Sequence, residues 1–531
     1  MSLARQTFKH SAIYSFGTVL GRLISFLMLP FYAHIFETQG YGVIGVIDAA
    51  LGVLSLLITA GLHVAIQRFY HEAPTAEKSR VISTGVRLAW TFGLGLLVPL
   101  LLFAKPISQF LLGTSDYAGL VRLASVTLVV TLASASAGAF LVIEQRSMII
   151  SALALLQLVI GLSLNILLVI VLQFGIIGTF ISSLACASVA FVLVHILVLP
   201  KTGLAFDPDI ARRIVRFQAP LIPSEIAAYL SRQAELFFIR FMISLEGAGI
   251  LDMGYKFAPL LNLFITGPFL TAWRTKNMEL GDSQEARQIA SRMFTRWFFL
   301  VTFLATLLAV NIAAILAMLT PPSFWPAAGI ARIELLTTVM SGANTWLVFG
   351  LLYYKKTSKV AVIKSTAAAL KVALSAALIS YAGLRGAAYS ALITEALLVV
   401  WIASAAQRLY PIPFEYGRLA ILSGAALALS LSLTLLPPGQ VPLVGYLDAH
   451  AGPAVLQFLQ ATPLADWRGG KLLQLLTTRQ LYVYEVLAKS LLACSYLGLV
   501  FVVEPHLLRS LRAASRMQSL VRTATAYIGI R

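Results

Sequence analysis

Apolar segments long enough to cross a lipid bilayer recur along the whole chain, and short polar connectors separate them. A transmembrane helix needs about 20 apolar residues, so the pattern predicts about fourteen such helices. We expect them at residues 11–36, 42–67, 82–104, 118–143, 149–172, 175–199, 217–243, 248–272, 290–318, 327–352, 361–382, 385–407, 415–436 and 482–503. The predicted fold class is an all-α polytopic membrane protein with about 14 transmembrane helices.

The chain also repeats itself. The motif GIIGTFIS, which starts at Gly175, returns about 208 residues later as GLRGAAYS, which starts at Gly383. A similar shift relates Gly42 to Gly249, and the connector at Arg146 to the one at Lys355. We therefore predict two six-helix lobes in parallel repeat, followed by two C-terminal helices. The predicted domains are 1–206 (N-lobe), 207–413 (C-lobe), 414–503 (the last two spans, with an extracytoplasmic loop at 437–481) and 504–531, a basic cytoplasmic tail.

Composition supports this interpretation. The 531 residues are 59% hydrophobic and only 12% charged, and the formal net charge is +18. The Lys and Arg residues lie mainly in alternate connectors, which places both termini in the cytoplasm by the positive-inside rule. Nucleic acid is not expected as a partner, because no basic soluble face is formed. Cys186 and Cys494 both lie in apolar spans and indicate no disulfide framework.

The predicted span 217–243 carries four charged residues, which is unusual at membrane depth. A charge there costs at least about 2.5–3.5 kcal/mol by insertion scales, so such residues normally face a bundle interior or a watery cavity. Glu225, Arg232 and Arg240 fall on one side of the helix, with Glu235 at its edge. We interpret the helix as one wall of a polar cavity. The alternative is an Arg–Glu pair that only holds helices together.

Polar stripes also mark other early helices of the two repeats. Arg22 lies on a stripe in the first span, Asp48 on one in the second, and Asp252 and Lys256 share a side of the eighth. These helices are expected to line a cavity between the lobes. The alternative for Asp252 and Lys256, four residues apart, is that they pair with each other. Lys371 and Glu395 lie at similar depth on either side of Gly383 and are expected to form a buried structural pair.

Catalytic and metal-binding motifs are missing from the sequence. It contains no nucleotide-binding loop of the G-x-x-x-x-G-K-[ST] type, no H-E-x-x-H and no G-x-S-x-G. No enzyme activity, metal site or cofactor is therefore expected, apart from H⁺ or Na⁺ as a coupling ion. The alternative is a glycan polymerase or ligase that uses His450, Asp466 and Arg468 of the 437–481 loop, which otherwise forms an amphipathic cap at the membrane interface.

Several stretches resemble a known family. They are YSFGTVLGRLISFLMLPFYAHIFETQGYGVIGVIDA, APLIPSEIAAYLSRQAELFFI, GAGILDMGYKFAPLLNLF and GIIGTF, and the likeness runs over residues 8–410. The chain resembles the Wzx-type polysaccharide-unit flippases of the multidrug/oligosaccharidyl-lipid/polysaccharide (MOP) exporter superfamily. The resemblance implies a MATE-like fold and alternating access. The implied substrate is an undecaprenyl-diphosphate-linked oligosaccharide, translocated across the bacterial inner membrane. The implied partners are membrane lipids and the polysaccharide polymerase and export machinery.

Cavity arginines suit such a substrate, because guanidinium binds phosphate bidentately and keeps its charge. We expect Arg22, Arg232, Lys256 and Arg240 to bind the diphosphate. The acidic residues Asp48, Glu225, Glu235 and Asp252 are candidates for gating or ion coupling. Members of the family often carry adjacent acidic and basic residues in the seventh span, whereas Arg232 and Glu235 stand three apart here. A cation or drug antiporter of the same superfamily is a further alternative.

Overall fold

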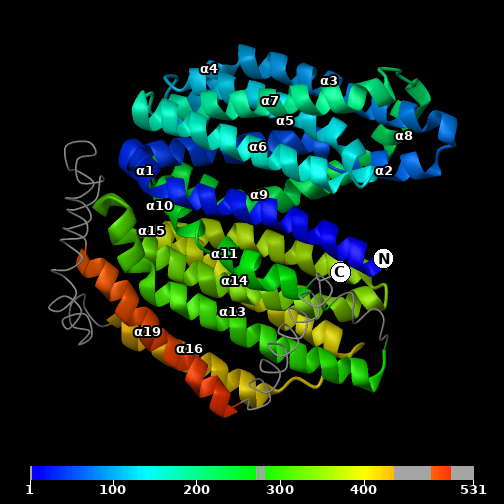
Figure 1. Cartoon of the computed structure of the whole chain (residues 1–531). Coiled ribbons are helices and arrows are strands. Elements are labelled where there is room, and N and C mark those ends of the chain that lie inside the picture. Colours follow the sequence, from blue (N-terminus) through cyan, green and yellow to red (C-terminus); the bar gives the residue numbers. More distant parts are fainter. Residues whose placement is uncertain (1–2, 271–272, 274–281, 436–479, 504–531) are drawn as a thin grey trace, which may run out of the picture. The chain divides into compact units, whose positions relative to one another are not determined.

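The computed structural model describes residues 3–270, 273, 282–435 and 480–503. All regular structure in these ranges is helical (Figure 1). Among the described residues, nine helices are long and apolar enough to cross a membrane, which confirms the all-α polytopic class without fixing the number of crossings. The predicted loop at 437–481, with His450, Asp466 and Arg468, and the tail at 504–531 lie almost wholly outside these ranges.

The helices divide into two compact units. The first comprises Met1–Lys256, Thr320–Ile330 and Lys364–Thr394, and the second comprises Phe257–Leu319, Ala331–Ile363 and Glu395–Arg531. The predicted lobe boundary at residue 206 falls inside the first unit. The division into repeat lobes therefore stays a prediction.

Most of the first unit is a continuous series of helices. They are α1 (Leu3–Thr59), α2 (Leu62–Glu72), α3 (Lys78–Leu102), α4 (Ala104–Leu112), α5 (Ala118–Ile143), α6 (Ser147–Asn165), α7 (Ile176–Thr202), α8 (Pro208–Gln218), α9 (Leu221–Met242) and α10 (Leu245–Tyr255). The 3₁₀ turns η1 (Thr75–Glu77) and η4 (Pro322–Phe324), the π-helix η2 (Ile166–Val171) and the central part of α15 (Thr357–Gln407) belong to the same unit.

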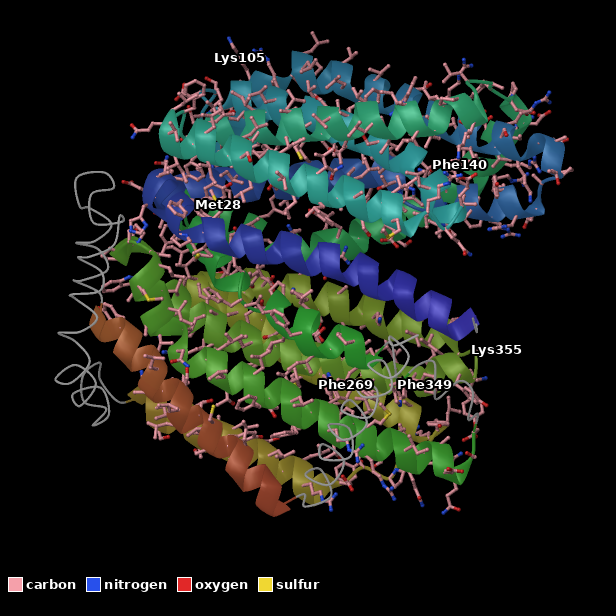
Figure 2. The ribbon with its side chains drawn as sticks, in the orientation of Figure 1. Met28, Lys105, Phe140, Phe269, Phe349 and Lys355 are labelled. Carbon is pink, nitrogen blue, oxygen red and sulfur yellow. The ribbon has the colours of Figure 1, made fainter. Side chains whose placement is uncertain are left out.

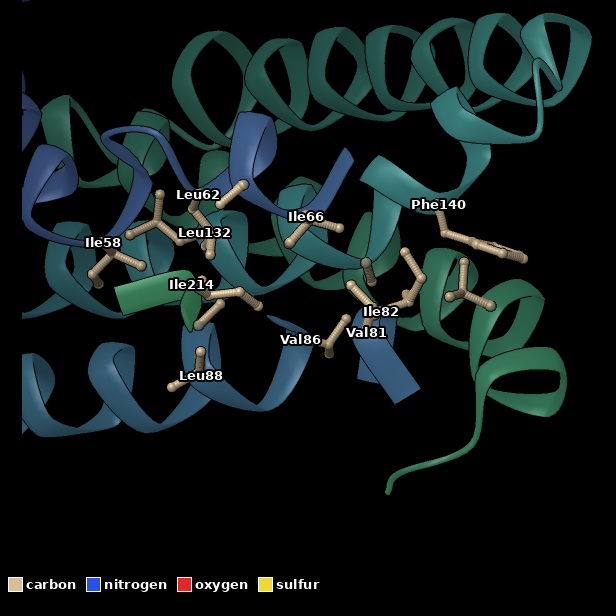
Figure 3. Packing of buried hydrophobic residues seen from close by; sticks show 14 of the residues in the cluster. Ile58, Leu62, Ile66, Val81, Ile82, Val86, Leu88, Leu132, Phe140 and Ile214 are labelled. Atoms are coloured by element: carbon tan, nitrogen blue, oxygen red, sulfur yellow. The ribbon is translucent and has the colours of Figure 1, made fainter. Parts of the chain in front are cut away.

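The core of the first unit is an apolar cluster that gathers α2, α3, α5, α7 and α8 (Figure 3). Ile66, Val86 and Ile214 are fully buried there, and Phe140 packs at one end. Asp207 caps α8 by accepting hydrogen bonds from the backbone N–H groups of Asp209 and Ile210. The buried side of α8 joins the cluster, while Arg212, Arg213 and Arg216 remain exposed.

The second unit contains the rest of the helices. They are α11 (Pro259–Leu261), the π-helix η3 (Asn262–Thr266), α13 (Gln284–Leu319), most of α14 (Ala327–Tyr353), the ends of α15, α16 (Tyr416–Leu435) and α19 (Gln480–Val503). Its core is aromatic: Phe294, Trp297 and Trp346 contact one another, and Trp273 contacts Trp346 with 4.4 Å between ring centroids.

Two of the predicted repeat positions have matching backbone geometry. Gly175 has φ 62° and ψ −143°, and Gly383 has φ 59° and ψ −136°. This region suits glycine, because a Cβ atom would clash there. The two connectors also match: Gln145 and Lys355 have φ 55° and 56°, and each precedes the start of a helix. The sequence repeat therefore reflects a repeated local structure.

The predicted span 248–272 is not one uninterrupted helix. Helix α10 ends at Tyr255, and the chain resumes as α11 at Pro259. Proline lacks a backbone N–H and cannot continue the hydrogen-bond ladder of the preceding turn, so the helix is interrupted there. As a result Lys256 sits at the C-terminal end of α10, where the helix dipole favours a cation.

Candidate functional site

Three helices of the first unit meet closely enough to build a polar site. Helices α1 and α10 cross at two glycines: a Cβ on Gly42 would lie 2.0 Å from the Leu245 carbonyl oxygen, and one on Gly249 would lie 2.0 Å from that of Thr38. Further along α1, a Cβ on Gly52 would lie 1.9 Å from the hydroxyl oxygen of Tyr229 on α9. Glycine at these positions therefore allows α1 to approach both α9 and α10.

The first group of charges in this site joins α1 and α10. Lys256 Nζ lies 2.9 Å from Asp252 Oδ2, so the pair considered in the sequence analysis exists. Asp48 on α1 interacts electrostatically with both of these residues. Two carboxylates and one ammonium thus share the group, and Asp48 is exposed. One negative charge remains unbalanced within it, which suits a small cation or a proton better than a diphosphate.

The second group contains Arg232 on α9. Its guanidinium carbon lies 5.6 Å from the ring centroid of Tyr229, and the Tyr229 hydroxyl is hydrogen-bonded to the Gln233 side chain. The Arg232 side chain is exposed. In the part of the chain that the structure describes, Arg232 forms no ion pair, so its planar fork of donors is open to a ligand. The electrostatic contact with the ring orients the guanidinium without neutralising it.

The third group lies between α9 and α15. Lys371 Nζ is 2.9 Å from Glu235 Oε1, and the Glu235 side chain is only 1% exposed. Tyr255 and Ser390 also contribute hydrogen bonds to this carboxylate. Ser375 and Ser390 are themselves 2.9 Å apart, hydroxyl to hydroxyl, in the same buried layer. Glu235 is therefore a buried carboxylate surrounded by polar groups, with Lys371 as its counter-ion.

The partners of Lys371 and Glu395 differ from the predicted ones. Lys371 pairs with Glu235, while Glu395 Oε2 accepts a hydrogen bond from Asn344 Nδ2 at 2.6 Å in the second unit. Sequence spacing around Gly383 predicts a similar depth for both residues, but it does not predict the side of the helix on which each lies. The spacing therefore identified two partly buried polar positions and assigned the wrong contact to Lys371.

The remaining predicted residues are placed as follows. Arg240 donates from Nε to the Leu111 carbonyl oxygen at 2.7 Å and thereby caps the end of α4, which gives it a structural role. Glu225 is exposed near the start of α9. Arg22 lies in α1, within the stretch whose side chains are outside the description. Tyr255 and Ser390 were not predicted, because hydroxyl-bearing residues in apolar spans are too common to single them out.

Lys105 lies at the start of α4 and Lys355 lies just after α14 (Figure 2). Within the described ranges, no three His, Cys, Asp or Glu side chains come together as a metal site. The site thus consists of an open arginine, an acid-rich triad and a buried ion pair.

Comparison with known proteins identifies the fold. A structure titled "Lipid II flippase MurJ, inward closed conformation" matches with a TM-score of 0.68 and 13% identity, over 94% of this chain and 100% of that one. An inward-facing multidrug resistance MATE family transporter of the MOP superfamily matches with a TM-score of 0.60 and 14% identity, over 76% of this chain and 96% of that one. A MOP superfamily transporter from Pyrococcus furiosus matches with a TM-score of 0.51 and 13% identity, over 78% and 96%.

A search of curated protein sequences returns no match. The profile of the family described as "Polysaccharide biosynthesis protein" matches residues 8–273, just over half of the 531 residues, and includes α1, α9 and α10. The resemblance seen in the sequence is confirmed. The chain belongs to the polysaccharide biosynthesis protein family, with the fold shared by MurJ and the MATE transporters of the MOP superfamily.

Proposed function

We propose that the protein is a flippase that moves an undecaprenyl-diphosphate-linked oligosaccharide, the repeat unit of a polysaccharide, across the bacterial inner membrane by alternating access. Both termini lie in the cytoplasm in this proposal. The observation that carries it is Arg232: an exposed guanidinium in a membrane-depth helix, oriented by Tyr229 and free of any ion pair among the described residues. Guanidinium binds two phosphate oxygens at once.

The three groups of the site have different tasks in this proposal. Arg232, together with Arg22, binds the diphosphate. The Asp48–Asp252–Lys256 triad carries the coupling ion, H⁺ or Na⁺, because its net charge is negative. Glu235 and Lys371 hold α9 against α15 and are structural. Relative to the sequence-based roles, Lys256 and Arg240 are reassigned, since Asp252 and the Leu111 carbonyl engage them.

The test is genetic. The gene is deleted, and lipid-linked glycan in the inner leaflet and exported polymer are quantified in cells complemented with wild type, R232Q, the R22A/R232A double variant or R212Q. Arg212 is the matched control, because its side chain is 83% exposed on α8 and lies outside the site. We expect complete lipid-linked units to accumulate with R22A/R232A and export to be normal with R212Q.

Three results would contradict the proposal. Full export by a well-expressed R22A/R232A variant would show that these two arginines do not form the diphosphate site. Single units that accumulate on the outer leaflet of the deletion strain would point to a polymerase or ligase that acts after translocation. Resistance to cationic dyes without any change in glycan export would indicate a cation antiporter.

A further inference from the structure

The first unit contains a cavity that the charged site does not use. It lies between α5, α6 and α7, has a volume of about 480 Å³, and is called the α5–α7 cavity here. Its polar lining comes mainly from Thr127, Thr131, Gln157, Asn165, Ser182 and Cys186. A second cavity of about 400 Å³ shares Ala135, Gln157 and Val194 with it and extends to His63 and Gln67. None of the lining residues belongs to the three charged groups.

The walls of the α5–α7 cavity are polar but uncharged. Helix α5 contributes Thr127 and Thr131, one turn apart on one face, and α6 contributes Gln157 and Asn165, two turns apart. No Asp, Glu, Lys, Arg or His residue lines this cavity. Three helices thus present hydroxyl and amide groups to a common space.

Hydrogen bonding leaves these walls rich in acceptors. Thr127 and Ser134 donate their hydroxyl hydrogens to the carbonyls of Leu123 and Val130, both at 2.9 Å. Asn165 donates from Nδ2 to the Gly161 carbonyl at 2.8 Å. The hydroxyl hydrogens of Thr127 and Ser134 and one of the two amide hydrogens of Asn165 are therefore occupied, while the oxygen lone pairs of these groups remain available.

Two lining groups lack any partner within the described structure. Ser182 is fully buried, and its Oγ atom forms no hydrogen bond. The Oδ1 atom of Asn165 is likewise buried without a partner. Buried polar atoms are nearly always hydrogen-bonded, because leaving them unpaired in an apolar environment is costly. Both residues line the α5–α7 cavity, so these two unpaired oxygens lie in its walls.

We propose that the α5–α7 cavity binds a neutral, hydroxyl-rich ligand, namely a sugar of the translocated glycan. Such a ligand supplies donors to the free acceptors without bringing a charge. A cation would be desolvated with no carboxylate to balance it, and an anion would find no guanidinium or ammonium. The volume lies within the range of small-molecule sites, about 300–1,000 Å³. This inference rests on the proposed function, since it assigns the glycan part of that substrate to a site apart from Arg232.

Cys186 provides a direct probe, because it lines the cavity and its Sγ donates to the Gln157 carbonyl at 3.2 Å. The full-length C494A variant in membranes is alkylated with N-ethylmaleimide in the presence of glucose, galactose or N-acetylglucosamine, or of tetraphenylphosphonium or inorganic pyrophosphate. We expect at least one neutral sugar to slow the alkylation of Cys186, and the cation and the anion to have no effect. The C186A variant shows that the same sugar leaves Cys494 unaffected.

The matched variants are S182A and Q157L in the cavity and S188A outside it. Ser188 is on the same helix as Ser182, and its hydroxyl bonds to the Leu184 carbonyl. S182A and Q157L should raise the half-protecting sugar concentration about five- to tenfold, as expected for the loss of one or two hydrogen bonds, while S188A leaves it unchanged. S182A removes a single oxygen atom and should leave the fold intact. A change in protection by this variant can therefore be assigned to the lost hydrogen bond.

Three results would overturn the inference. No sugar protects Cys186 from alkylation, or tetraphenylphosphonium protects it better than any sugar. The third is that the half-protecting sugar concentration is the same in S182A and Q157L as in wild type. Glycan export in the complemented deletion strain tests the proposed function independently of this alkylation experiment. Protection by sugar together with normal export in the deletion strain would reject the flippase and keep the sugar site. Loss of export without protection would reject the sugar site alone.

Discussion

Glu235 and Lys371 form an ion pair between α9 and α15, with 2.9 Å between Oε1 and Nζ. The two partners are unequally buried: the Glu235 side chain is 1% exposed, whereas that of Lys371 is 20% exposed. Buried ion pairs contribute little compared with apolar packing, but removing one partner strands the other charge. The difference in burial therefore predicts which single substitution is worse.

K371M should destabilise the protein by about 3–5 kcal/mol, because it leaves a carboxylate without its counter-ion in a dry site. E235Q should cost less, since the remaining ammonium can be partly hydrated. Thermal unfolding in detergent, followed by the loss of the monodisperse fraction, would measure both. E144Q is the control, because Glu144 pairs with Arg146 and Lys201 near the surface and should change stability by only about 0–1 kcal/mol.

Charge reversal separates pairing from general polarity. The E235K/K371E double variant should recover part of the stability that K371M loses, because the two charges again face each other. If E235K/K371E is no more stable than K371M, the pair does not act as a unit, and the hydroxyls of Tyr255 and Ser390 must account for the tolerance of Glu235.

The crossing of α1 and α10 should not tolerate any side chain at its two glycines. In G42A the new methyl group would lie 2.0 Å from the Leu245 carbonyl oxygen, and in G249A it would lie 2.0 Å from that of Thr38. Each variant must separate the helices, at a cost of about 1–3 kcal/mol or more. Both should also lower export, since the same helices carry Asp48 and Asp252.

The control is G95A on α3, where a Cβ would meet nothing within 4 Å. There the substitution should be neutral or stabilise by about 0.5–1 kcal/mol, because alanine favours helix. Equal thermal stabilities of G42A and G95A would show that the close approach at the crossing is not needed.

Sequence patterns predicted much of this structure, because membrane helices are determined by long apolar runs. The predicted span 118–143 coincides with α5, and the repeated GxxG motif marked the shared conformation of Gly175 and Gly383. Polarity in apolar spans likewise located Asp48, Arg232, Glu235 and Lys371. The contacts were not predictable, since they depend on helix rotation: Lys371 faces Glu235, and Arg240 turns to the end of α4.

A cluster of Asp282, Arg287 and Tyr354 next to α13 should make the thermal stability fall at acidic pH. Asp282 accepts hydrogen bonds from the Tyr354 hydroxyl and from Arg287, whose Nη2 lies 2.8 Å from Oδ1. The bond from Tyr354, followed by the contact with Arg287, lowers the pKa of the Asp282 carboxyl. A lowered folded-state pKa stabilises the protein above the unfolded value of about 3.9, and this stabilisation is lost as pH falls through the folded value.

Y354F should therefore lose less thermal stability than wild type between about pH 6 and about pH 3, since it lacks the bond that acid would break. The measurement is a thermal-unfolding series across this range. D209N serves as the control, because Asp209 is exposed and 3.9 Å from Arg212, so its acid response should match wild type. Superimposable curves for Y354F and wild type would rule out the contribution of Asp282.

The two arginines of α9 should separate stability from transport. Arg240 caps α4 through the Leu111 carbonyl, so R240A should destabilise by about 1–2 kcal/mol and reduce export only as far as folded protein is lost. R232Q removes an exposed guanidinium that makes no ion pair among the described residues, so stability should stay within about 0.5 kcal/mol. Its export per folded molecule should nevertheless fall, because the diphosphate loses a bidentate partner. Export and unfolding temperature, both normalised to protein in the membrane, distinguish the two variants. If R240A lowered export per folded molecule as much as R232Q does, the capping role would not be sufficient, and Arg240 would return to the substrate site where the sequence first placed it.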